Sequence, residues 1–241
     1  MKKGESSNVM HGAKPFVSII IPAFNEQKNI GDILKKTCMV AESSSFPFEI
    51  IVVDDGSTDL TVDLAKQYEV TVLTGGVNEG KGAALRRGFV HARGEILITM
   101  DADGSHDPED IPNLLLPVLN GATLALGTRF ASEEGKRSTT KLNLFGNGLI
   151  NLSIMLLTAK QVTDSQCGFR AMKQTFLRGL NLVSDRYEVE TEVLVKALVK
   201  GSPVTEVPLR ISKRKNGHSH LNPFGDGFKI MKTVIASAIA R

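Results

Sequence analysis

The sequence predicts an α/β fold in which a mostly parallel sheet carries helices on both of its faces. Short apolar runs rich in β-branched residues recur along the first half of the chain, as expected for buried parallel strands. Amphipathic stretches separate these runs, so the predicted order is βαβαβαβ, which right-handed crossovers join into one sheet. With 241 residues, of which 41% are hydrophobic, the chain is long enough for one large domain.

The elements of the first half are assigned from the spacing of their apolar residues. Strands are predicted at 16–21, 49–53, 70–73 and 95–100. A helix that opens at 25–26 should bury the face on which side chains recur at helical spacing, namely Ile30, Ile33, Leu34 and Thr37. The next helix should start at Thr58 or Asp59 and run to Tyr68, and a third is predicted at 80–92.

The second half continues with helices and strands that polar loops connect. Helices are predicted at about 109–119, 142–158, 188–200 and 228–240, and strands at 123–127, 168–172 and 204–211. Two basic segments, 133–141 and 213–222, are expected to be loops. We divide the chain into a polar N-terminal extension at 1–15, a main domain at 16–227 and a C-terminal amphipathic helix at 228–241.

Carboxylates stand at the ends of two predicted strands. Asp101 and Asp103 follow the fourth strand, and Asp54 and Asp55 end the second. In an open α/β sheet, ligands bind outside the carboxyl ends of the strands. Two adjacent carboxylates repel each other unless a cation joins them, and their hard oxygens suit Mg²⁺ or Mn²⁺, which also hold phosphates. The alternative is that these residues only cap helices and close turns.

Charge is divided unevenly along the chain, although the net charge is only +3. Residues 1–110 hold 11 Lys and Arg against 17 Asp and Glu, whereas residues 111–241 hold 18 against 9. An acidic half suited to a metal thus precedes a basic half suited to an anion. The two cysteines, Cys38 and Cys167, form no CxxC pattern, which argues against a zinc site and fits a reducing compartment.

A phosphate-loop hydrolase is the main alternative among nucleotide-binding proteins. Residues 75–82 fit the pattern G-x-x-x-x-G-K, and an apolar strand with a terminal Asp follows them. However, Gly82 replaces the Ser or Thr that should bind Mg²⁺, and Glu79 would place a negative charge among the phosphates. No G-x-G-x-x-G follows a predicted strand, so a dinucleotide oxidoreductase is not favoured either.

Seven motifs carry a resemblance to a known family. Four of them resemble the family-2 glycosyltransferases of the GT-A fold, namely Pro22–Glu26, Val52–Asp59, Asn78–Gly82 and Met100–Asp103. Three more are similar to motifs of the dolichyl-phosphate mannose and hexose synthases, namely Gly127–Phe130, Asp164–Ala171 and Arg214–Leu221. The resemblance covers about residues 17–232 and implies a Rossmann-like GT-A domain, followed by helices and a loop on the acceptor side.

The resemblance also implies roles for particular residues. Asp101, Asp103 and Ser105 would hold Mg²⁺ or Mn²⁺ at the diphosphate of a nucleotide sugar. The other expected donor contacts are Pro22, Ala23, Glu26, Asp54, Asp55, Lys81, Ala102, Arg170, Arg214 and His220. Arg129 and Arg137 would hold the acceptor phosphate, so that Asp103, Arg129 and Arg137 are the expected catalytic residues. Arg214 and His220 would lie on a loop that closes over the donor.

The implied reaction is the inverting transfer of a sugar to dolichyl or another polyprenyl phosphate. A phosphate monoester is largely ionised at neutral pH, because its second pKa is about 6, and it therefore needs no strong general base. The metal would neutralise the departing diphosphate, and the arginines would position the acceptor. Ser105 and His220 stand where mannose synthases have Gln and Lys. Both GDP-linked and UDP-linked hexoses or N-acetylhexosamines therefore remain candidate donors.

Two other functions share the same donor site. A glycosyltransferase of this fold can instead transfer the sugar to a saccharide hydroxyl, and a non-catalytic module can bind a nucleotide sugar without turnover. Formation of a lipid-linked sugar would distinguish transfer to a polyprenyl phosphate from both of these alternatives.

The lipid acceptor implies contact with a membrane, although no stretch reaches 18 consecutive apolar residues and no ordinary spanning helix is expected. Residues 1–15 lack the apolar core of a signal peptide. The helix at 228–240 has Lys229 and Lys232 opposite its apolar side and need bury nothing, which suits the headgroup layer of an anionic membrane. Residues 142–157 are a second candidate. We expect a peripheral protein on the cytoplasmic face of a membrane, with no nucleic-acid partner.

Overall fold

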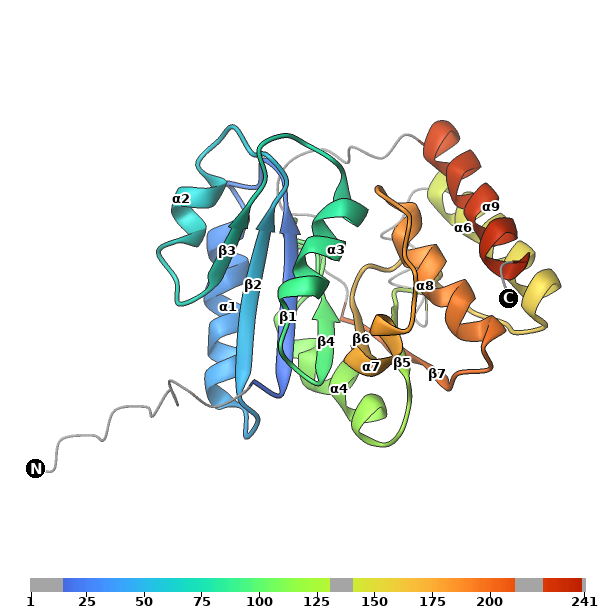
Figure 1. The fold of residues 1–241 in the computed structure, drawn as a ribbon, viewed down its shortest axis with the longest axis horizontal. Helices are drawn as coiled ribbons and strands as arrows, with labels where there is room; N and C mark the ends of the chain where they lie inside the picture. The colour runs from blue at the N-terminus through green and yellow to red at the C-terminus, as the bar shows by residue number, and fades with distance from the viewer. Residues whose placement is uncertain (1–14, 131–140, 211–222, 240–241) are drawn as a thin grey trace, which may run out of the picture.

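A computed structural model describes residues 15–130, 141–210 and 223–239, and a seven-stranded sheet forms the centre of the molecule (Figure 1). The strands lie in the order β3-β2-β1-β4-β6-β5-β7. Their bounds are β1 Val17–Ala23, β2 Phe48–Asp54, β3 Thr71–Thr74, β4 Ile96–Thr99, β5 Leu124–Thr128, β6 Arg170–Lys173 and β7 Val204–Pro208. The predicted α/β fold is confirmed.

One antiparallel strand interrupts a sheet that is otherwise parallel. Strand β6 runs antiparallel to both β4 and β5, while the other neighbouring pairs are parallel. Thr99 at the end of β4 pairs with Arg170 at the start of β6. The segment that precedes β6 therefore lies beside the carboxyl end of β4, where Asp101 follows.

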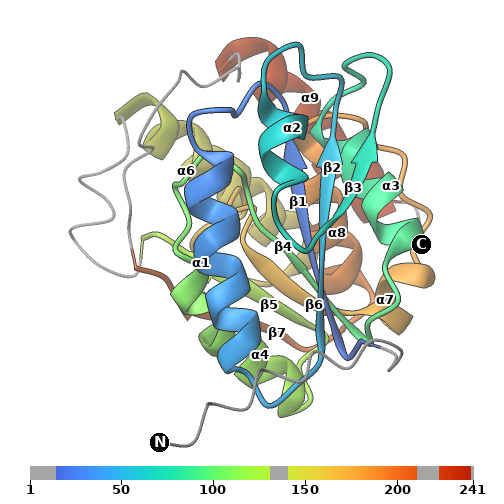
Figure 2. The same ribbon diagram turned by 90° about the vertical axis from the view of Figure 1, so that its left-hand side faces the viewer.

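Helices cover both faces of the sheet, because successive side chains of a strand point to opposite sides. One face packs against α1 (Ile30–Ser43), α2 (Thr61–Ala65) and α4 (Ile111–Leu119), and the other against α3 (Lys81–His91), α7 (Gln174–Arg178) and α8 (Glu188–Val199). Within β1, Ile19 and Ile21 face the first group and Ile20 faces the second. Figure 2 shows α1 in front of the sheet and α8 behind it.

A further layer lies outside α8. Helices α6 (Lys141–Thr158) and α9 (Pro223–Ile239) lie side by side, and both contact α8 (Figure 1). Ile154 of α6 and Val234 of α9 are fully buried in the core on this side of the sheet. Within the ranges described above, no helix is long and apolar enough to cross a membrane.

Most predicted elements are present, but several bounds differ. Helix α1 begins at Ile30 rather than at 25–26, and α9 begins at Pro223 rather than at 228. Helix α1 buries the four side chains that were expected on its inner face. Helix α2 is shorter than predicted, at Thr61–Ala65. In the turn before it, the Asp59 carboxylate accepts hydrogen bonds from the Thr61 amide at 2.9 Å and from the Gln27 amide at 3.1 Å. Asp59 thereby joins this turn to the segment before α1. Strand β7 ends at Pro208 rather than at residue 211, and α7 was not predicted.

Candidate active site

A lysine and two carboxylates from separate elements meet at the carboxyl end of β4. Lys81 is the first residue of α3, Asp101 follows β4, and Glu190 lies in the first turn of α8. The Lys81 Nζ lies 2.5 Å from Asp101 Oδ1 and 2.5 Å from Glu190 Oε1. The Glu190 side chain is 6% exposed and that of Asp101 is 27% exposed. One ammonium group is thus shared between a buried and an accessible carboxylate.

The pair of Lys81 and Asp101 is charged at neutral pH. Burial acts to raise the pKa of Asp101, but the charge of Lys81, with a smaller contribution from Arg129, lowers this pKa to about 2. Burial acts to lower the pKa of Lys81, but Asp101 and Glu190 outweigh it, so that this pKa is raised. Asp101 is therefore ionised, as a carboxylate that binds a cation must be.

Gly168 leaves the space that this ion pair occupies. A Cβ atom at Gly168 would lie 2.8 Å from both Asp101 Oδ2 and Lys81 Nζ. The Gly168 carbonyl also accepts a hydrogen bond from Thr99 Oγ1 at 2.8 Å, which fixes the glycine beside the end of β4. A side chain at this position would displace the ammonium or the carboxylate.

Asp103 and Ser105 form the turn that follows β4. Asp103 Oδ1 accepts a hydrogen bond from the Ser105 amide at 2.9 Å. In the part of the chain that the structure describes, no three His, Cys, Asp or Glu residues are grouped so that they could hold a metal ion. The donor chemistry nevertheless fits Mg²⁺ or Mn²⁺, since a cation, the Lys81 ammonium, already contacts the hard oxygens of Asp101. Phosphate oxygens and water would have to complete such a site.

His106 has a structural position beside these residues. Its side chain is buried, its Nδ1 accepts a hydrogen bond from the Asp101 amide at 3.3 Å, and its ring stacks on Phe169 at 5.1 Å between centroids. Burial lowers the pKa of His106 despite the nearby carboxylates. These contacts give His106 the role of a structural hydrogen-bonding partner.

Arg129 is held in a fixed orientation at the end of β5. Its Nε and Nη2 donate to Asp164 Oδ2 at 2.7 Å and to Oδ1 at 2.9 Å, and the Asp164 side chain is fully buried. Burial acts to lower the pKa of Arg129, and the hydrogen bonds to Asp164 raise it above its ordinary value. A third of the Arg129 side chain stays exposed, so the guanidinium can still meet an anion.

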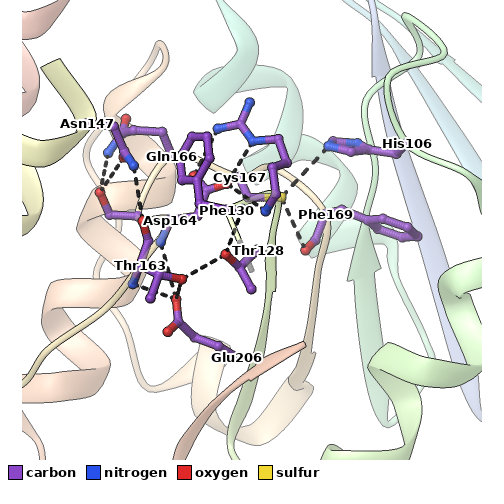
Figure 3. A network of polar contacts seen from close by, with 12 residues as sticks. His106, Thr128, Phe130, Asn147, Thr163, Asp164, Gln166, Cys167, Phe169 and Glu206 are labelled. Carbon is purple, nitrogen blue, oxygen red and sulfur yellow. Dashed lines mark hydrogen bonds and ion pairs between the residues drawn. The ribbon is translucent and has the colours of Figure 1, made fainter. Parts of the chain in front are cut away.

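The segment that carries Asp164 is itself anchored to the sheet (Figure 3). Thr163 Oγ1 lies 2.7 Å from Thr128 Oγ1 and donates to Glu206 Oε1 at 2.8 Å, which joins the segment to β5 and β7. The side-chain amide of Asn147 in α6 donates from Nδ2 to the Thr163 carbonyl at 3.2 Å. Arg129 is therefore positioned by a chain of contacts that reaches the outer helix layer.

Asp54 and Asp55 hold loops together at the ends of β1 and β2. Asp54 accepts from the amides of Gly56 and Ser57 at 3.2 Å. Asp55 accepts from the amides of Glu79 at 3.1 Å and Gly80 at 2.7 Å, and burial raises its pKa. We expected a donor contact for both, but Asp54 is 2% exposed and closes its own turn, and Asp55 is 3% exposed and also accepts from Arg87 Nη2 at 3.2 Å. The simpler interpretation of a turn residue is the better one for Asp54.

The same contacts exclude a phosphate loop at residues 75–82. The amides of Glu79 and Gly80, which would have to face phosphates, are directed to Asp55. Gly82 packs against the segment before α8, since a Cβ atom there would clash with the Ser184 carbonyl oxygen. The hydrolase alternative is therefore wrong.

The remaining donor residues lie along the same edge of the sheet. Pro22 is half-buried and Ala23 is buried at the end of β1, and the Ala23 carbonyl accepts from the Asp55 amide at 2.9 Å. Glu26 is half-buried and accepts from Asn29 Nδ2 at 2.6 Å. Ala102, between the two aspartates after β4, is buried. Arg137, Arg214 and His220 lie outside the described residues.

The geometry of Arg170 argues against the donor contact that was expected of it. Its side chain is 1% exposed, and its guanidinium donates to the backbone carbonyls of Cys167, Ser165 and Glu190. These bonds satisfy the charge inside the protein, so the side chain is not available to a ligand. Arg170 instead joins β6 to the first turn of α8 and supports Glu190.

Sequence reasoning did not identify Glu190, or the parts that Asp164 and Gly168 play. Asp164 and Gly168 belong to a motif that was noted, but their partners, Arg129 and the Lys81 pair, lie far away in the sequence. Glu190 lies in a predicted helix with glutamates at positions 188, 190 and 192, and both Glu190 and Glu192 are buried. That spacing was the available signal.

Comparisons with known proteins agree with this geometry. Residues 18–180 match the family model described as Glycosyl transferase family 2. An uncharacterized protein of Methanocaldococcus jannaschii is 34% identical over 99% of this chain and 98% of its own length. A dolichol-phosphate mannosyltransferase of Pyrococcus furiosus is 32% identical over 85% of this chain, which spans only 59% of that enzyme.

Solved structures show the same fold. Glucosyl-3-phosphoglycerate synthase from Mycobacterium tuberculosis, in complex with Mn²⁺, UDP-glucose and phosphoglyceric acid, has a TM-score of 0.72 at 22% identity. The match covers 99% of this chain and 86% of that one. This likeness confirms the predicted GT-A fold. The matched family model covers more than half of the sequence, and the chain therefore belongs to glycosyl transferase family 2.

Proposed function

We propose that the protein transfers a sugar from a nucleotide sugar to a polyprenyl phosphate. The observation that carries this proposal is the pairing of two sites at one edge of the sheet, an acidic site at Asp101 and a fixed, exposed guanidinium at Arg129. Arg129 is close enough to Asp101 for its charge to lower the pKa of that carboxyl. Relatives named as dolichol-phosphate and undecaprenyl-phosphate transferases support the same acceptor class.

On the donor side, the half-buried residues Pro22 and Glu26 would line the nucleoside pocket, with Asp55 beneath them. Asp101 and Asp103 would hold Mg²⁺ or Mn²⁺ against the diphosphate, and Ser105 is the further oxygen proposed for it. The metal would supply positive charge that stabilises the departing diphosphate. Lys81 would add a second positive charge at the same place.

On the acceptor side, Arg129 would bind the phosphate of the lipid. An oxygen of this phosphate attacks the anomeric carbon, and the bond from that carbon to the diphosphate breaks, so that the configuration inverts in one displacement. The phosphate is already ionised and requires no base. Asp164 keeps the guanidinium oriented, so that little orientation is lost on binding. Arg137, Arg214 and His220 are proposed to complete the site.

A donor screen tests this proposal. The protein is incubated with radiolabelled GDP-linked and UDP-linked sugars, Mn²⁺ and a short-chain polyprenyl phosphate, with and without excess chelator. We expect label in the solvent-extractable lipid with one donor, and none with chelator. Label in a saccharide, or donor binding without any transfer, would instead support the hydroxyl transferase or the non-catalytic module.

We also propose that the protein lies on the cytoplasmic face of a membrane through α6 and α9. Exposed apolar residues recur along α6 at spacings of three and four, namely Leu142, Phe145, Leu149, Leu152 and Leu156. No charged residue follows Lys141 in this helix. Helix α9 adds exposed Phe228 and Ile239 beside Lys229 and Lys232, which suits anionic headgroups.

The structure changes the expected balance between the two helices. Helix α9 was expected to bury nothing, yet Ile230 and Val234 pack into the core. Helix α6 exposes the longer apolar stripe, so it should contribute more of the membrane contact. Replacing Leu152 and Leu156 by Glu should abolish sedimentation with anionic liposomes, whereas Leu116→Glu on α4, also at an exposed leucine, should not. Equal binding by all three proteins would exclude α6 as the contact.

A further inference from the structure

Glu190 is the least satisfied charged group in the centre of the site. Its side chain is 6% exposed, and Oε2 is buried without a hydrogen-bond partner. The other oxygen contacts Lys81, which Asp101 also contacts. Leaving a buried carboxylate oxygen unpaired costs free energy, so an interaction with a further partner should compensate for it.

We propose that Lys81 is an exchangeable cation, which neutralises Asp101 in the free protein and moves to the donor diphosphate when a divalent metal takes its place. Glu190 is the positioning residue for this exchange, because it keeps the ammonium in the site after Asp101 is released. The proposal rests on the donor site of the proposed function, but not on the identity of the acceptor.

Charge explains why both carboxylates are needed. Lys81 contacts the carboxylates of both Asp101 and Glu190, whereas the nearby Arg170 guanidinium donates to the backbone carbonyl of Glu190 and not to its carboxylate. One ammonium is thus shared between two carboxylates, which leaves Asp101 only partly compensated and favours a second cation. Without Glu190, Lys81 would pair with Asp101 alone and compete fully with the metal. Without Lys81, Asp101 would be free for the metal, but the ammonium that meets the diphosphate would be lost.

The backbone around Lys81 is fixed, so the exchange requires movement of the side chain only. The Gly80 amide donates to Asp55, and the Ala83 amide donates to the Asp185 carbonyl at 3.0 Å. Arg86 of the same helix contacts the Ser184 carbonyl and Asp185. Gly168 lies next to the Lys81 ammonium. Because it has no side chain, it leaves space around the ammonium and offers it no side-chain partner.

Binding measurements on the full chain test the exchange without any turnover. Free Mn²⁺ is followed by electron paramagnetic resonance, and UDP or GDP binding by calorimetry, whichever nucleotide the wild type binds with Mn²⁺. Lys81→Met should bind Mn²⁺ alone about tenfold more tightly but bind the nucleotide with Mn²⁺ about tenfold more weakly, the change expected for a hydrogen bond to a charged group. Lys35→Met, an exposed lysine on α1, should change neither.

Glu190→Gln provides the complementary variant. It keeps the shape of the side chain and should weaken binding of Mn²⁺ alone, because Lys81 then pairs only with Asp101. Lys81→Arg should keep both affinities nearer to those of the wild type than Lys81→Met does. The proposal is overturned if Lys81→Met lowers or leaves unchanged the affinity for Mn²⁺ alone, or if Glu190→Gln behaves as Lys35→Met. Loss of lipid transfer with these binding results intact would count against the proposed function alone.

Discussion

Two strand ends at the same edge of this sheet each carry a pair of aspartates, and the two pairs are satisfied in different ways. After β2, Asp54 and Asp55 accept hydrogen bonds from backbone amides of neighbouring loops, and Asp55 also accepts one from Arg87 Nη2 at 3.2 Å. After β4, Asp101 pairs with the flexible side chain of Lys81. Backbone amides are fixed by the fold, whereas an ammonium on a long side chain can leave. The first pair therefore holds the loops of the site together, whereas the partner of Asp101 is a side chain that a ligand could displace.

The largest effect should come from the accessible carboxylate. Asp101→Asn removes the charge that a metal and Lys81 both require, so we expect at least a hundredfold loss of sugar transfer with the fold retained, although the melting temperature should fall because the ionised form of Asp101 stabilises the fold. Asp103→Ala should likewise abolish turnover and leave the fold intact. Activity is measured by transfer of label, and stability by circular dichroism. Wild-type activity in Asp101→Asn would show that the carboxylate after β4 is not needed for sugar transfer.

Substitution of Arg129 tests whether the acceptor site is separate from the two pairs of aspartates. Arg129→Lys keeps a positive charge near Asp164 but loses the two-point contact, so acceptor use should fall tenfold to a hundredfold, the equivalent of about 1.5–3 kcal/mol. Nucleotide binding should be unchanged. Kinetics at varied polyprenyl phosphate, with calorimetry of the nucleotide as the control, distinguish the two. A matching loss of nucleotide affinity would place Arg129 on the donor side.

Asp55 should behave in the opposite way to Asp101. Asp55→Ala leaves the amides of Glu79 and Gly80 without their acceptor, which should lower the free energy of unfolding by about 1–3 kcal/mol. Urea denaturation measures this loss. Asp107→Ala, at a half-buried carboxylate that caps a single amide, is the control and should cost less. An unchanged midpoint for Asp55→Ala would show that these bonds do not hold the loops.

The smallest effect concerns acid. The folded pKa of Asp101 is lowered to about 2 from an ordinary value of 3.8, so its ionised form stabilises the fold above pH 4, and this contribution is lost between about pH 4 and pH 2. Burial raises the pKa of Asp55, so its contribution to the pH dependence of stability has the opposite sign to that of Asp101. Unfolding of Asp101→Asn should therefore depend less on pH in this range than unfolding of the wild type. An equal pH dependence of unfolding in the two proteins would contradict the lowered pKa of Asp101.

The sequence was sufficient to predict the sheet, the acidic strand ends and the inner face of α1. These features depend on short apolar patterns and on the rule that ligands gather at the carboxyl ends of parallel strands. It was not sufficient for Arg170, which carries the charge of a ligand-binding residue but is satisfied by carbonyls from two elements. Contacts between distant segments decide which aspartate pairs with backbone amides and which pairs with Lys81. Short motifs do not encode these contacts.

The acceptor decides the proposed function most directly. Vesicles that contain either a polyprenyl phosphate or the matching polyprenol are given the protein, Mn²⁺ and the labelled nucleotide sugar that the donor screen identifies. We predict that label enters the lipid only when the phosphate is present, and that Asp101→Asn abolishes this transfer. Equal labelling of the polyprenol, or labelling by Asp101→Asn at the wild-type rate, would contradict transfer to a lipid phosphate at this site.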